Sequence, residues 1–137
     1  TDGCASNNTL DMIKEMSTAA KLHKVAMLDP TVMNALTALR MATINGAKAL
    51  GMGNLTGSLE VGKKADIILL GLNKPHLTPM YNAYSHLVYA ASGADVDSVI
   101  INGKLVMEDR RLLTIHEDEI MAEVRKIAVN IKKSMNM

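Results

Sequence analysis

The order of the predicted secondary-structure elements is the feature that most constrains the fold of this sequence. Hydrophobic periodicity and turn residues predict five helices and three strands. The helices are expected at 8–24, 34–41, 45–50, 81–91 and 114–131, and the strands at 66–70, 98–101 and 104–107. Three strands cannot close a barrel. We therefore expect an α/β structure that is incomplete as an isolated chain.

Polar residues indicate where the helices begin. Asn8 and Asn34 are expected to cap the first two helices, and Thr114 with Glu117 has the spacing of a capping box for the last. Gly51 is expected to end the third helix. In the first helix, the residues expected to face the interior are Met12, Met16, Ala19, Ala20 and His23.

The strand signals differ in kind. Residues 66–70 include an uninterrupted apolar run, which is typical of a buried strand. The strands at 98–101 and 104–107 flank Asn102-Gly103, the dipeptide that best tolerates positive φ at both central positions of a type I′ turn. The strands at 98–101 and 104–107 are therefore predicted to form a β-hairpin.

Composition excludes several classes of protein. Fifteen Lys and Arg against fourteen Asp and Glu, without a long basic run, argue against a nucleic-acid partner. The apolar stretches are too short to span a membrane, so we expect a cytoplasmic protein. The single cysteine, Cys4, excludes an internal disulfide and disfavours a thiolate zinc site. The start at Thr1, without Met, suggests processing or truncation.

Five blocks of sequence resemble one branch of a known family. They are TDGCASNN with the following LDM and EM at 1–16, LRMATINGAKALG at 39–51, GSLEVGKKAD at 57–66, SHLVYAASG at 85–93 and INGK at 101–104. Together they are similar to the C-terminal part of metal-dependent amidohydrolases, in the 5-methylthioadenosine/S-adenosylhomocysteine deaminase and chlorohydrolase branch. The resemblance covers essentially the whole chain.

The resemblance implies an architecture and a cofactor. It implies a (β/α)8 TIM barrel, with one divalent metal, usually zinc, at the C-terminal face of its strands, beside a small β-sandwich domain. Residues 1–54 would supply the end of the eighth barrel strand and its following helices, residues 55–113 part of the β-sandwich with an intervening helix, and residues 114–137 an amphipathic helix. The family's other metal ligands and its acid glutamate would lie upstream of Thr1.

Asp2 is the residue to which the resemblance gives a role in the chemistry. It matches the metal-binding and catalytic aspartate, which also touches the substrate. A carboxylate beside zinc can take a proton from water that the metal has acidified and can return it to departing ammonia. From the residues alone, an aspartate that caps a turn through Gly3 is the simpler interpretation, and the resemblance reverses that preference.

The neighbours of Asp2 have less specific predictions. Ser6 is a candidate for contact with the substrate, while Asn7 and Asn8 either orient Asp2 or begin the helix. Cys4 is interpreted as a space-filling side chain. The four histidines, none at ligand spacing from another, are assigned to structure: His23, His76, His86 and His116.

The functional hypothesis follows from the resemblance. We expect the C-terminal segment of a zinc-dependent deaminase that converts 5-methylthioadenosine or S-adenosylhomocysteine to the inosine analogue and ammonia. The alternatives are a triazine chlorohydrolase or guanine deaminase, and a non-enzymatic assembly module. The expected partners are the upstream barrel portion, a purine nucleoside and further copies of the chain. The isolated chain is expected to be inactive, because one ligand cannot hold a catalytic zinc.

Overall fold

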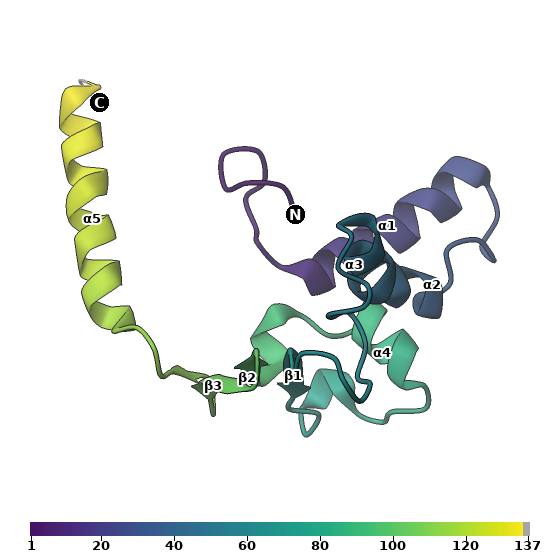
Figure 1. Cartoon of the computed structure of the whole chain (residues 1–137). Helices are drawn as coiled ribbons and strands as arrows, with labels where there is room; N and C mark the ends of the chain where they lie inside the picture. The colour runs from purple at the N-terminus through teal and green to yellow at the C-terminus, as the bar shows by residue number, and fades with distance from the viewer. Residues whose placement is uncertain (136–137) are drawn as a thin grey trace.

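The structure is a computed structural model that describes residues 1–135, with a group of helices beside a small antiparallel sheet (Figure 1). The α-helices are α1 (Met12–Met27), α2 (Ala35–Arg40), α3 (Gly46–Ala49), α4 (Ala83–Tyr89) and α5 (Glu117–Ser134). A π-helical segment (Met41–Asn45) and two 3-10 turns (Pro75–Leu77 and Gly93–Asp95) complete the helical elements. The strands are β1 (Ile67–Leu70), β2 (Val96–Ile101), β3 (Lys104–Glu108) and β4 (Arg111–Leu112).

Helix α1 begins later than the sequence predicts, because Asp11 and not Asn8 is its N-cap. Asp11 Oδ1 accepts hydrogen bonds from the backbone N–H groups of Ile13 at 3.0 Å and Lys14 at 3.2 Å. Asn8 lies outside the helix and is exposed. The prediction of its role as a cap was wrong because two residues with capping side chains lie close together, and a sequence does not show which one reaches the free amides.

The buried face of α1 is also shifted from the predicted one. The buried residues are Ile13, Met16 and Ala20, while Met12 and His23 are exposed. Met16 and Ala20 were predicted correctly. At the start of the helix the buried residue is Ile13 instead of Met12, and the buried face ends before His23. The interior therefore contains a smaller part of this helix than the sequence indicates.

Residues 35–49 form one continuous helical run, in which α2 leads through the π-helical segment into α3. Asn34 caps it as predicted, since its side chain accepts from the N–H of Thr37 at 3.0 Å. The prediction of two separate helices was wrong because the wider turn of Met41–Asn45 continues the backbone without a break. The helical core joins α1, α2 and α4 through Ile13, Met16, Ala20, Ala38 and Val88.

The sheet is an antiparallel meander in the order β1-β2-β3-β4. The predicted hairpin is confirmed: Asn102 and Gly103 link β2 to β3 with φ values of 51° and 77°. The short β4 was not predicted, because its turn places Asp109 and Arg110 at positive φ without a glycine to indicate it. Helix α4, within the range predicted for the β-sandwich part, packs on α1 and α2.

Strand β1 is present where expected but is not buried. It lies at the edge of the sheet, paired only with β2 within residues 1–135, and Ile68 and Leu69 are 48% and 52% exposed. The prediction of a buried strand therefore fails for the described residues. An apolar edge of this kind is unfavourable in water unless another surface covers it.

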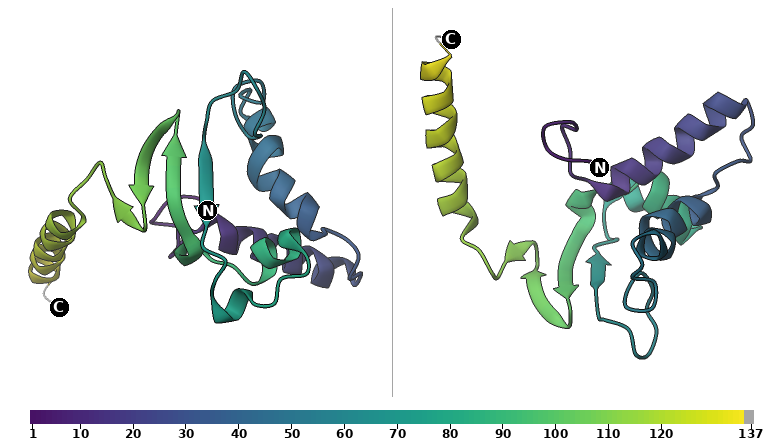
Figure 2. Two further views of the ribbon diagram at one scale, coloured as in Figure 1. Left: turned by 90° about the horizontal axis from the view of Figure 1, so that it is seen from below. Right: turned by 45° about the horizontal axis from the view of Figure 1, so that its top comes forward.

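Helix α5 stands away from the rest of the molecule (Figures 1 and 2). None of its residues is buried. His116 occupies its N-cap position without a side-chain capping bond, so the predicted capping box of Thr114 and Glu117 was wrong. Three acidic residues in the first turn, Glu117, Asp118 and Glu119, favour the positive end of the helix dipole instead.

None of the helices within residues 1–135 has the length and apolar character that a membrane crossing requires.

Candidate functional site

Asp2 lies in an exposed loop ahead of α1. Its backbone has φ 57°, a left-handed value that few residues other than glycine, asparagine and aspartate adopt readily. One carboxylate oxygen accepts a hydrogen bond from the N–H of Gly3 at 2.7 Å. The turn contact expected from the residues alone is therefore present, and it leaves most of the carboxylate open to solvent.

The loop is closed by backbone hydrogen bonds that converge on Gly3. Its carbonyl oxygen accepts from the N–H of Ser6 at 2.9 Å and from that of Asn7 at 3.0 Å. Ser6 is exposed on this turn, four residues after Asp2. Cys4 is exposed as well, so it fills no space among the described residues. The loop therefore presents Asp2, Cys4 and Ser6 to the outside.

Asn7 connects this loop to α1. Its side-chain nitrogen donates to the carbonyl oxygen of Thr1 and to Oε1 of Glu15, each at 2.8 Å. Its side-chain oxygen accepts from the N–H of Thr9 at 3.1 Å. Asn7 is half-buried, unlike the exposed Asn8 beside it. Of the two asparagines considered in the sequence, Asn7 has the contacts that orient the loop.

Residues 1–135 contain no cluster of three or more His, Cys, Asp and Glu side chains that could hold a metal. A catalytic zinc usually has three protein ligands and an open position. The donor chemistry of Asp2 suits one of those ligands, because its carboxylate is exposed and only partly occupied by Gly3. His23 and His116 are exposed, and His86 is half-buried on α4.

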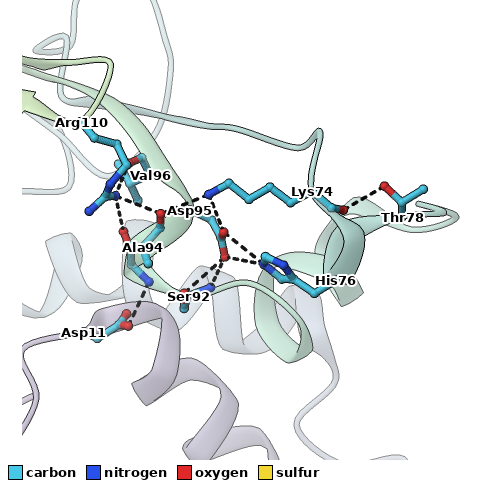
Figure 3. A network of polar contacts seen from close by, with 10 residues as sticks. Asp11, Lys74, His76, Thr78, Ser92, Ala94, Asp95, Val96 and Arg110 are labelled. Atoms are coloured by element: carbon cyan, nitrogen blue, oxygen red, sulfur yellow. Dashed lines mark hydrogen bonds and ion pairs between the residues drawn. The ribbon is translucent and has the colours of Figure 1, made fainter.

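The densest polar network lies elsewhere, around Asp95 (Figure 3). This carboxylate is buried, with 2% of its side chain exposed, and pairs with Lys74 Nζ at 2.8 Å. His76 Nε2 lies 3.1 Å from both carboxylate oxygens, and Ser92 donates its backbone N–H at 2.9 Å. The hydrogen bond from Lys74 is the main cause that holds the pKa of Asp95 well below its usual value, against the opposing effect of burial, with His76 and Ser92 adding to it.

The network around Asp95 was missed by the sequence analysis. Lys74 and His76 lie about twenty residues before Asp95, on a separate loop, so no local spacing indicates the contact. The structural assignment of His76 agrees with this contact, which joins the loop before α4 to the start of β2. All the polar side-chain atoms that are buried within residues 1–135 have a hydrogen-bond partner.

The network also reaches α1. The second carboxylate oxygen of Asp11 accepts from the N–H of Gly93 at 2.9 Å (Figure 3). A Cβ added at Gly93 would lie 3.2 Å from the carboxylate atoms of Asp11, a tight contact that would require the Asp11 side chain to shift slightly. The start of α1, on which the Asp2 loop is mounted, is thereby joined to the turn before β2.

A large apolar hollow opens beside the helices. Its volume is about 870 Å³, and it is lined by α1, the helical run 35–49, the turn after it and β1. Most lining side chains are aliphatic or methionine, including Met12, Leu39, Leu50 and Ile68. Because its lining is mostly apolar and contiguous, this hollow has the character of a surface that another part of a protein covers.

Comparisons with known proteins give this geometry a context. The model of the amidohydrolase family matches residues 1–106. The chain is 62% identical to 5-methylthioadenosine/S-adenosylhomocysteine deaminase 1 of Syntrophus aciditrophicus, over 98% of this chain and 30% of the relative. It is 48% identical to 5′-deoxyadenosine deaminase of Methanosarcina mazei, over 99% of this chain and 31% of the relative. The chain thus spans about 30% of the length of these curated relatives.

Solved structures agree with the sequence relatives. A zinc-bound adenosine deaminase from Xanthomonas campestris matches 96% of this chain and 30% of its own, with a TM-score of 0.92 and 41% identity. A zinc complex of atrazine chlorohydrolase from Arthrobacter aurescens TC1 matches 83% of this chain and 25% of its own, with a TM-score of 0.74 and 25% identity. The family model covers most of the chain, and both the fold and the sequence relatives agree with it: this chain belongs to the amidohydrolase family.

Proposed function

We propose that this chain is the C-terminal segment of a zinc-dependent hydrolytic deaminase that acts on adenosine-type substrates. The observation that carries the proposal is the exposed, loop-mounted carboxylate of Asp2 in a chain whose similarity to named deaminases extends over 98% of its length. The substrates would be 5-methylthioadenosine and S-adenosylhomocysteine, the compounds in the name of the relative that is 62% identical. Their products would be the inosine analogue and ammonia.

Asp2 would be both a metal ligand and the group that moves the proton. Zinc, when bound, lowers the pKa of water toward neutrality. Asp2 would accept a proton from the attacking water, and the water oxygen would bond to the purine carbon that bears the amino group. The bond between this carbon and its amino nitrogen would then break. Asp2 would return the proton to the amino group, which would leave as ammonia. Ser6, exposed on the same turn, would contact the substrate.

The remaining metal ligands would come from residues outside this chain. Asp2 supplies one ligand, and residues 1–135 contain no cluster that completes a zinc site. The relatives are about three times as long as the segment they share with this chain, which leaves room for a TIM barrel. Residues 1–54 would complete that barrel, and residues 55–113 would contribute the sheet to a small β-sandwich.

The uncovered apolar surfaces support the same proposal. The hollow beside the helices and the half-exposed β1 are surfaces that the upstream barrel portion would cover, or that copies of the chain would bury in a homo-oligomer. Helix α5 also presents apolar residues with nothing packed on them within the described part of the chain, among them Ile120, Val124 and Ile127. These surfaces argue against a segment that is a self-sufficient domain, whether its partner is the barrel of a deaminase or another copy in an assembly module.

The test is the product spectrum of the complete protein that contains this segment. Purified with zinc, it is expected to release ammonia from 5-methylthioadenosine, S-adenosylhomocysteine or 5′-deoxyadenosine, with far lower rates on guanine. Release of chloride from atrazine in preference to ammonia from the nucleosides would favour a chlorohydrolase. A zinc-loaded protein that turns over none of these compounds would favour the non-enzymatic assembly module.

A further inference from the structure

The side chain of Asn7 is a bridge between the Asp2 loop and the first turn of α1. Its Nδ2 donates to Thr1 O and to Glu15 Oε1, both at 2.8 Å, and its Oδ1 accepts from Thr9 N at 3.1 Å. We propose that Asn7 and Glu15 are positioning residues that hold the Asp2 carboxylate in its reactive place. This inference rests on the proposed function, because it assigns a role through Asp2.

The chemistry of Asn7 matches its three partners in one orientation. The nitrogen has two protons and faces two acceptors, while the oxygen faces a backbone donor. A rotated amide would place its oxygen against the carbonyl of Thr1 and the carboxylate of Glu15, which repel it. An aspartate at this position could not supply the two donors. The site therefore requires an amide with a fixed direction.

Thr1 is the partner through which this bridge reaches Asp2. The carbonyl group that Asn7 holds belongs to the peptide bond between Thr1 and Asp2, so it restrains the backbone rotation that aims the carboxylate. Asp2 has φ 57°, a left-handed conformation that aspartate adopts more readily than most residues but that is still uncommon outside glycine, so contacts around it help to hold it. The bridge of Asn7 provides that support from inside the loop.

Glu15 gives the bridge a rigid base. It lies in the first turn of α1, where a negative charge is favoured by the helix dipole. The start of the same helix is fixed by Asp11, whose carboxylate caps α1 and also accepts from Gly93 at 2.9 Å. A movement of Asn7 would therefore have to break a bond to an anchored helix.

Removing the hydrogen bonds of Asn7 should lower kcat, because the Asp2 carboxylate would no longer be held in place. In the complete protein, Asn7→Ala should reduce kcat by about tenfold to a hundredfold, since a displacement of about 1 Å at a reacting group has an effect of this order. KM should change by less than about threefold, because Asn7 is given no contact with the substrate. Asn8→Ala is the matched control: it removes the same amide one residue later, from an exposed position.

Glu15 offers a conservative pair that tests the same bond. Glu15→Gln keeps an oxygen that can accept from Asn7, so kcat should stay within about threefold of the parent. Glu15→Ala removes that acceptor and should lower kcat as Asn7→Ala does. Should Asn7→Ala fold poorly, the comparison of the two Glu15 variants carries the test by itself. Equal losses in both Glu15 variants would overturn the role of the bond.

A double-mutant cycle distinguishes positioning from general stability. If Asn7 acts through Asp2, adding Asn7→Ala to Asp2→Asn should lower kcat by less than about twofold further. The same fold loss in both backgrounds, or an Asn7→Ala enzyme with parental kcat, would overturn the inference while leaving the proposed function intact. An Asp2→Asn enzyme with near-parental kcat would instead contradict the proposed function, and the positioning role with it.

Discussion

Two aspartates in this chain, Asp2 and Asp95, have opposite surroundings. Asp95 is buried and holds contacts with Lys74, His76 and Ser92, whereas Asp2 is exposed and its carboxylate accepts a single hydrogen bond, from Gly3, among the described residues. Both carboxylate oxygens of Asp95 are occupied by hydrogen bonds, so this group has little capacity to accept a proton from water. The open carboxylate of Asp2 is the one to which we assign the proposed chemistry.

The two aspartates also differ in where their partners lie. The contacts of Asp95 lie within the described chain and join the loop before α4 to the turn before β2. Around Asp2, by contrast, residues 1–135 contain no group of side chains that could hold a metal with it, and its only carboxylate hydrogen bond comes from Gly3. The contacts of Asp95 thus support a structural role, whereas the role proposed for Asp2 requires ligands from outside residues 1–135.

The largest expected effect comes from removing the charge of Asp2. In the complete protein, Asp2→Asn keeps the size of the side chain but removes the proton acceptor, so kcat should fall by about two orders of magnitude or more. Steady-state ammonia release, with zinc content measured in parallel, checks this. Near-parental turnover with bound zinc would show that Asp2 is not the base. Asp2 would then have no catalytic role to set against the structural role of Asp95.

Replacing Asp95 should lower the stability of the protein and leave kcat almost unchanged, the opposite of the effect expected at Asp2. Asp95→Ala leaves Lys74 and His76 without their shared partner and should lower the free energy of unfolding by about 2–3 kcal/mol. The kcat of the folded fraction should stay within about threefold. Denaturant unfolding and active-fraction kinetics of the complete protein measure both. A hundredfold loss of kcat without a change in stability would place Asp95 in the chemistry.

Acid should remove the contribution of Asp95. Its pKa in the folded protein lies below the ordinary value of 3.8, chiefly because of the hydrogen bond from Lys74. The stabilisation is therefore complete above that ordinary value and is lost as the pH falls below it toward the folded pKa. The difference in unfolding free energy between the parent and Asp95→Ala should be constant from neutral pH down to about pH 5 and should shrink as the pH is lowered below 3.8. A difference that stays constant there would argue against the ion pair.

Asp11 connects the two regions, so its replacement should affect both properties moderately. Asp11→Ala removes the cap of α1 and the bond from Gly93, at a cost of about 1–2 kcal/mol in unfolding free energy. Because α1 also supports the Asp2 loop, kcat should fall by about threefold to tenfold. Unfolding and turnover measured on one preparation test the link. A loss of stability with unchanged kcat would show that the two regions are independent.

The smallest effect is expected at Cys4. Its side chain is exposed beside Asp2, and it is not part of any metal-binding group among residues 1–135. Cys4→Ala should leave the zinc content of the complete protein unchanged. Elemental analysis of the purified variant measures this directly, and a loss of zinc would add a thiolate to the ligands and change the account of the loop.

The sequence predicted elements whose signals are local. Asn102-Gly103 specifies its own turn geometry, and Asn34 caps the helix that follows it, so both could be predicted without knowledge of the rest of the molecule. The capping box of Thr114 failed because α5 begins after His116. The apolar run of β1 indicated burial, but its strand lies at an edge that the described residues do not cover.

The candidate site was predicted only in part, for a related reason. Asp2 could be singled out by resemblance, and Asn7 remained one of several alternatives until its three hydrogen bonds were seen. The pairing of Asp95 with Lys74 depends on two segments meeting in space, and no periodicity or spacing indicates it. Contacts between distant segments are the information that a single sequence lacks.

The central claim is that the chemistry belongs to Asp2 but requires residues outside this chain. Its most direct test is ammonia release from 5-methylthioadenosine by the purified 137-residue chain with added zinc, beside the complete protein. The account predicts turnover by the complete protein and none above the buffer rate by the chain alone, because one carboxylate does not hold a catalytic zinc. Zinc-dependent ammonia release by the isolated chain would contradict it.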